Sequence, residues 1–165
     1  MVAGVAGALV IVACGGAGLP DLESCRAPTP IVVPSGASAG DIEDAYRAAI
    51  ITGIDNIIAE SLSFTARHPS RELSNNSAFR RDYVAAEQNN VCGAAWLISL
   101  DPPAAYLDGF HAELSKMLGE YVETMALGHA AVKSRNVSDF RKWDGRENSV
   151  IERLSVIGDS IPTGP

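Results

Sequence analysis

The stretch from Asp101 to Lys133 is the sequence feature that most limits what this chain can fold into. It opens with Asp101-Pro102-Pro103 and continues to Lys133 without another proline. We predict a single helix over Asp101–Lys133, with Asp101 as its N-cap and both prolines in its first turn, where their missing N–H groups cost nothing. Apolar side chains recur along this stretch at the three- and four-residue spacing of one helix face: Leu107, Phe110, Leu114, Leu118, Tyr121, Val122, Met125 and Val132.

Two segments before this stretch show the same helical spacing. The first predicted helix covers Asp41–Arg67, capped by Ser38 or Asp41 and ended by His68-Pro69, because the residue before a proline resists the helical conformation. Three further apolar positions widen its buried arc, so we expect it to be buried on more than one side; they are Ile51, Ile58 and Leu62. The second predicted helix covers Ala78–Leu100, and its inner arc includes Asn90, which we expect to be a hydrogen-bonded core residue.

A fourth amphipathic segment follows the polar break at Ser134–Ser138, with Asn136 or Ser138 as its cap. Asp144-Gly145 lies in its middle, and Glu147 falls on its apolar arc. We therefore expect a kink or a break there. Four amphipathic helices joined by short to medium connections predict an all-α protein, a four-helix up-down bundle over residues 41–160. A chain of 165 residues suits one such domain.

The N-terminal residues of the chain predict where in the cell the protein is located. Val2–Ala13 is small and apolar, long enough for the hydrophobic region of a signal peptide and too short to span a bilayer. The residues that end it, Ile11-Val12-Ala13-Cys14, resemble the lipobox of bacterial lipoproteins. The resemblance implies that residues 1–13 are a leader, that Cys14 is acylated, and that the N-terminal lipid holds the protein on a membrane. The alternative is a buried apolar segment with a core cysteine.

Residues 14–40 are rich in Pro, Gly, Ala and Ser, which predicts a tether or an extended strap. If Cys14 carries lipid, Cys25 and Cys92 remain as an even pair in an oxidising compartment. Cys92 lies on the outer side of the second predicted helix near Trp96, where the strap carrying Cys25 could cover it. We predict a Cys25–Cys92 disulfide, which would stabilise the fold by about 4 kcal/mol in the chain-entropy model. The alternative is two unrelated thiols.

Candidate metal ligands are few. His111 and His129 are five helical turns apart, roughly 27 Å along the axis, and cannot share a metal within one helix. Asp108 lies three residues before His111, a weak likeness to the carboxylate-x-x-His element of di-iron bundles, and Glu60 sits at the apolar edge of the first helix. No Glu-x-x-His element occurs in the sequence. We predict no metal site, with Asp108, His111 and Glu60 as the candidates if one exists.

Enzymatic chemistry has no motif to support it. The sequence contains no Gly-x-Ser-x-Gly elbow, no Walker loop and no Cys-x-x-Cys-His, so we predict neither catalysis nor a cofactor. The net charge of −7 argues against a nucleic-acid partner. One exception to the acidic balance is a group of cations on the fourth helix, which suits either anionic lipid headgroups or an ordinary solvated face: Arg141, Lys142, Arg146 and Arg153.

These features together predict an exported, lipid-anchored helical bundle that binds another envelope protein or acts as an interaction module. The proline pair followed by Tyr106, Phe110-His111 and Leu114 is similar to small helical extracytoplasmic bacterial lipoproteins of unassigned activity. The alternative is a bundle that holds a small ligand or a metal ion near His111.

Overall fold

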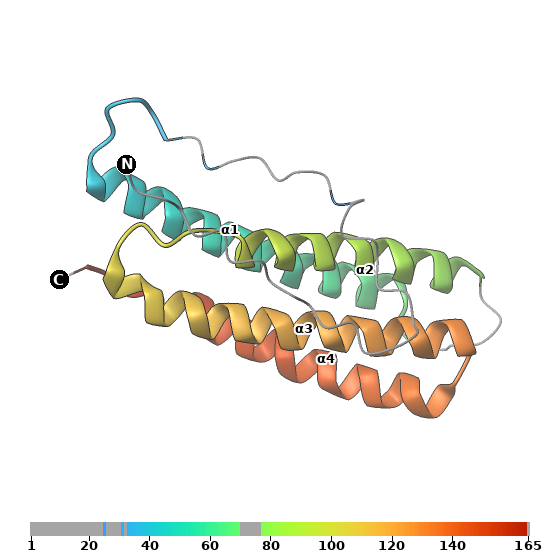
Figure 1. The fold of residues 1–165 in the computed structure, drawn as a ribbon. Helices are drawn as coiled ribbons and strands as arrows, with labels where there is room; N and C mark the ends of the chain where they lie inside the picture. The colour runs from blue at the N-terminus through green and yellow to red at the C-terminus, as the bar shows by residue number, and fades with distance from the viewer. Residues whose placement is uncertain (1–24, 26–30, 32, 70–76, 165) are drawn as a thin grey trace.

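Four long helices lie side by side and run alternately up and down (Figure 1). They are α1 (Ala39–Arg67), α2 (Ser77–Ile98), α3 (Asp108–Ser134) and α4 (Val137–Gly158), with a short 3-10 helix, η2 (Ala105–Leu107), before α3. This computed structural model describes residues 25, 31, 33–69 and 77–164, and no strand occurs among them. Each helix packs against the next, and α1 also packs against α4. The predicted all-α bundle is confirmed.

The predicted caps account for where two helices begin. The Ser38 side chain accepts from the Asp41 N–H at 3.2 Å, and the Asp41 carboxylate accepts from the Ser38 N–H at 2.9 Å, so the two residues form a capping box. Asn136 caps α4 by accepting from the N–H groups of Ser138 and Asp139. Arg135, at φ 56°, makes the left-handed turn between α3 and α4.

The predicted start of α3 is wrong. The helix begins at Asp108, and Asp101-Pro102-Pro103 lies outside it. Each proline disfavours the helical conformation of the residue before it, so the pair keeps both Asp101 and Pro102 out of a helix. The chain crosses the end of the bundle first, and η2 then leads into α3.

Of the kink or break predicted in α4, the break is wrong. Helix α4 is continuous from Val137 to Gly158, with Asp144-Gly145 inside it and Glu147 buried. A glycine inside a helix costs about 1 kcal/mol relative to alanine. Burying Trp143 on one side of the glycine and Val150 on the other stabilises the helix by about 1.5–3 kcal/mol for each side chain. Packing therefore outweighs the local penalty.

The expectation that α1 is buried on more than one side holds only in part. Ile58 packs against the core, whereas the side chains of Ile51 and Leu62 are 47% and 61% exposed. A helix in a ring of four has two neighbours, and its outward side stays in solvent. The widened apolar arc of α1 therefore includes a face that no other described part of the chain covers.

A line of aromatic rings joins three helices at one end of the core. Phe64 of α1 meets Phe79 of α2, which meets Phe140 of α4, with ring centroids 5.3 and 5.5 Å apart. Trp143 lies against Phe140 and, edge to face at 5.1 Å, against Tyr83 of α2. Such edge-to-face pairs add about 0.5–1.5 kcal/mol beyond their buried area. A glycine on α3, Gly128, makes room for the last two rings.

We predict that Gly128→Ala lowers the free energy of unfolding by about 1–3 kcal/mol, because a Cβ there would lie 1.9 Å from the Tyr83 hydroxyl and 2.7 Å from Trp143 Nε1. Gly119→Ala on the same helix is the matched control, since a Cβ there meets nothing within 4 Å. It should raise stability by about 0.5–1 kcal/mol. Urea unfolding measures both, and equal effects of the two variants would contradict the packing argument.

Candidate functional site

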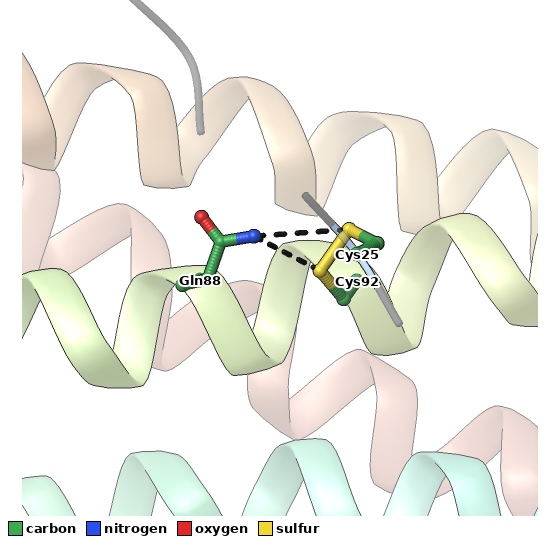
Figure 2. Close-up of a disulfide and its surroundings, with 3 residues drawn as sticks. All are labelled: Cys25, Gln88 and Cys92. Atoms are coloured by element: carbon green, nitrogen blue, oxygen red, sulfur yellow. Dashed lines mark hydrogen bonds between the residues drawn. A yellow bond between two sulfur atoms is a disulfide. The ribbon is translucent and has the colours of Figure 1, made fainter. Parts of the chain in front are cut away.

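A disulfide attaches the strap to the bundle. Cys25 and Cys92 are bonded, with their Cα atoms 5.3 Å apart, inside the usual range for a disulfide. Figure 2 shows Gln88, one turn earlier on α2, pointing its amide at the two sulfur atoms. Its Nε2 lies 3.1 Å from Cys92 Sγ and 3.8 Å from Cys25 Sγ. The predicted pairing is confirmed, and it places Cys25 against the outer side of α2.

His111 uses both of its ring nitrogens inside the bundle. Nε2 lies 3.3 Å from the Ile98 carbonyl oxygen, which can only accept, so Nε2 carries the proton. Nδ1 then accepts from the Tyr46 hydroxyl at 2.7 Å. Burial, helped by the charge of Asp108, raises the pKa of Tyr46 to about 12, which keeps its hydroxyl a donor. The ring ties α1 and the end of α2 to α3.

The three candidate metal ligands do not come together. Asp108 is exposed at the start of α3. Glu60 lies near the other end of α1, where its carboxylate is 3.6 Å from Arg67. Among the residues that the structure describes, no three His, Cys, Asp or Glu side chains converge as a metal would require. A metal at His111 would also have to displace the hydrogen bond that Nδ1 accepts from Tyr46 or the one that Nε2 donates to Ile98.

The second histidine of α3 forms a different and more deeply buried pair. His129 Nδ1 lies 2.7 Å from Glu87 Oε2 of α2. The His129 side chain is 24% exposed, whereas the Glu87 side chain has no exposed surface. The other oxygen, Glu87 Oε1, is buried with no hydrogen-bond partner among the described residues. The pair therefore places a carboxyl in the core and links it to solvent through one imidazole ring.

Burial controls the charge of this carboxyl. Loss of hydration raises the pKa of Glu87 to about 7, although the hydrogen bond and charge of His129 work in the opposite direction. The Tyr83 hydroxyl, which donates to the Met125 carbonyl at 3.1 Å, is nearby. Burial, then the charges of Glu87 and Glu147, raise its pKa well above the ordinary value. Chemically, the arrangement can hold or release one proton near neutral pH.

A neutral polar layer crosses the middle of the bundle. Asn90 Nδ2 donates to Tyr121 Oη at 2.8 Å and to Ser61 Oγ at 3.3 Å, and the two hydroxyl oxygens are 3.2 Å apart. The expectation that Asn90 is a hydrogen-bonded core residue is confirmed. The layer joins α1, α2 and α3. Its three side chains hydrogen-bond to one another.

Glu87 is the residue that sequence reasoning missed. Its burial could be predicted from the sequence, because Glu87 lies four residues after Tyr83 and three before Asn90, on the same inner arc of α2. A glutamate on an apolar arc indicates a buried charge that needs a partner. The sequence could not name that partner, since His129 belongs to another helix.

A shallow hollow lies on the surface of the described residues. A groove of about 330 Å³, open to solvent, runs between α3 and α4, lined by Glu113, Met117, Glu152, Arg153, Val156, Ile157 and Ser160. Among the helices of the described residues, none is both long enough and apolar enough to cross a membrane. Comparison of the chain with protein-family models, curated proteins and solved structures found no match.

We predict that Glu87→Gln changes how stability depends on pH. The Glu87 carboxyl keeps its proton up to about pH 7 when folded, against an ordinary value of 4.5. Between these values the folded chain binds more protons, so the free energy of unfolding falls as pH rises and levels off above about 7. The variant lacks this loss, and should gain up to about 3 kcal/mol on the wild type over that range.

Urea unfolding between about pH 5 and about pH 8 measures the effect. Glu123→Gln, at an exposed position of α3, is the matched control and should follow the wild-type curve. Parallel curves for Glu87→Gln and the wild type would contradict the buried-carboxyl account.

Proposed function

We propose that the protein is an exported helical bundle, lipid-anchored at Cys14, that acts as a binding module at the cell envelope. The observation that carries the proposal is the Cys25–Cys92 disulfide. Structural disulfides form and persist in oxidising compartments outside the cytosol. The bonded Cys25 follows closely after the lipobox-like Ile11–Cys14 segment, which itself lies outside the described residues. Two independent features of the same stretch therefore support export.

The interior supports a binding role over catalysis. The polar groups of the core bond to one another: His111 to Tyr46 and Ile98, and Tyr121 to Asn90 and Ser61. In these two networks the side chains hydrogen-bond to one another, whereas Glu87 Oε1 is the buried carboxylate oxygen that keeps no partner among the described residues. The alternative of a ligand or metal near His111 has less support, since both ring nitrogens of that histidine already have partners. Recognition of a partner then falls to the outward faces.

The anchor is tested by labelling cells with a clickable palmitate analogue. We expect label on the wild type and on Cys92→Ser, and none on Cys14→Ser, because only the thiol of Cys14 follows the lipobox pattern. Cys14→Ser should also move from the membrane fraction to the soluble one. A wild-type chain without label, recovered intact from the soluble fraction, would contradict the anchor.

Export is tested separately, by the redox state of the two remaining cysteines. With maleimide-polyethylene glycol as the probe, Cys25 and Cys92 should react only after reduction in the full chain. In a variant lacking residues 2–13 the chain should stay in the reducing cytosol, and both thiols should react directly. Oxidised cysteines in both chains would remove the disulfide as evidence for export.

The binding role is tested with a photo-cross-linking amino acid at one exposed apolar position per helix, in living cells: Leu62, Val84, Leu127 and Val156. A partner that covers one face should give a discrete adduct from that position and not from the opposite side of the ring. The buried position Leu97 is the control and should cross-link only within the chain. Folded chains with no adduct at any of the four positions would contradict the binding role.

A further inference from the structure

The charges of the bundle are separated between its two ends. One end is formed by the end of α1, the start of α2, the end of α3 and the first half of α4, and lies at the right in Figure 1. It carries eight of the eleven Lys and Arg residues that the structure describes, and we call it the basic end; they are Arg67, Arg80, Arg81, Lys133, Arg135, Arg141, Lys142 and Arg146.

The opposite end carries most of the exposed carboxylates. It is formed by the start of α1, the end of α2, the start of α3 and the end of α4. Only Arg47, Lys116 and Arg153 oppose the acidic residues there, and we call it the acidic end; the acidic residues are Asp41, Glu43, Asp44, Asp101, Asp108, Glu113, Glu152 and Asp159. The charges that sum to −7 are therefore unevenly distributed along the bundle.

Carboxylates at the basic end do not neutralise all of its cations. Three of these carboxylates form ion pairs: Glu60 with Arg67, Asp82 with Arg81, and Asp139 with Lys142. Glu87 and Glu147 are buried, and Asp144 is half-buried. Four exposed cations remain without a carboxylate partner among the described residues: Lys133, Arg135, Arg141 and Arg146.

An exposed apolar residue lies among these four cations. Val137, the first residue of α4, is 52% exposed and follows the turn made by Arg135. Cations around an apolar tip suit a lipid surface, where anionic headgroups attract Lys and Arg and the apolar side chain enters the interface. The acidic end would be repelled by the same surface.

The position of the strap does not itself choose an end. Eleven peptide bonds lead from Cys14 to Cys25, a reach of at most about 40 Å. Cys92, to which Cys25 is bonded, lies about 22 Å along the axis from the start of α2 and about 9 Å from its end. An anchor at Cys14 could therefore bring either end to a membrane. Which end faces the membrane then depends on the charges that each end carries.

We propose that the basic end docks onto an anionic lipid surface, so that the acidic end and the α2–α3 connection point away from the membrane. This orientation deepens the proposed function, on which it rests for the presence of the membrane. The cations of the basic end differ from the four of α4 that the sequence alone groups together for either anionic lipid headgroups or a solvated face. Arg153 belongs to the acidic half and pairs with Glu120 at 2.8 Å, while Lys133 and Arg135 of the preceding turn take its place.

The test is co-sedimentation of the unlipidated full chain, Cys14→Ser, with vesicles of phosphatidylcholine alone or mixed with phosphatidylglycerol. The chain should bind the anionic vesicles more strongly, and added salt should remove the difference. Any contribution from the apolar leader appears equally in both vesicles. Each Lys or Arg near an anionic surface changes binding roughly fivefold, so Arg141→Gln with Arg146→Gln should weaken it about 25-fold.

The matched control is Lys116→Gln with Arg153→Gln, which removes the same charge from the acidic half and should leave vesicle binding unchanged. Circular dichroism and urea unfolding show whether both double variants remain folded. Equal losses in the two variants would show that vesicle binding depends on the total charge and not on which end carries the cations, and would overturn the orientation. No preference for anionic vesicles would overturn the docking itself. Neither result bears on lipidation, which palmitate labelling reports.

Discussion

The hydroxyl of Tyr121 has to find hydrogen bonds in the middle of an apolar core, and the alignment of three helices follows from that need. Leaving such a group unpaired costs about 1–3 kcal/mol. Asn90 and Ser61 meet it from α2 and α1. A shift of either helix by one turn, about 5.4 Å, would strand all three side chains.

Two further buried pairs repeat this constraint at other heights. Tyr46 meets His111 near the acidic end, and Glu87 meets His129 in the half that holds the basic end. Apolar packing alone would tolerate small slides, since one leucine replaces another at modest cost. Because the three polar contacts lie at three levels along the bundle, an axial shift of α1, α2 or α3 would cost free energy in at least one of them. The interior is thus used to hold the helices in register, which leaves recognition to the surface.

Much of the fold was open to prediction because its determinants are local. The apolar spacing of each helix, the caps at Ser38 and Asn136 and the burial of Asn90 all depend on neighbours within a few residues. Errors arose where two local rules competed. The Asp101-Pro102-Pro103 sequence suits a helix start, yet prolines also exclude the residues before them, and the second rule prevailed. At Gly145 a break signal lost to the burial of its neighbours.

The candidate site was less accessible for a different reason. Spacing along α3 correctly keeps His111 and His129 apart, but says nothing of which side chains reach them from other helices. Glu60, the predicted carboxylate for a site at His111, lies at the far end of α1, whereas the carboxylate that meets a histidine is Glu87. Which side chains of different helices meet depends on the order of the helices around the bundle and on their positions along its axis. Those become known only when the bundle is assembled.

The Cys25–Cys92 bond also changes the covalent topology of the chain. It encloses the whole of α1 and the connection to α2 within one closed ring of residues. A single cut anywhere in that ring, by an envelope protease for example, opens the ring without separating the polypeptide into two pieces. Helix α1 then stays tied to the other three helices, and the cut becomes visible only after reduction. The disulfide therefore gives residues 25–92 a second covalent connection, in addition to the polypeptide backbone.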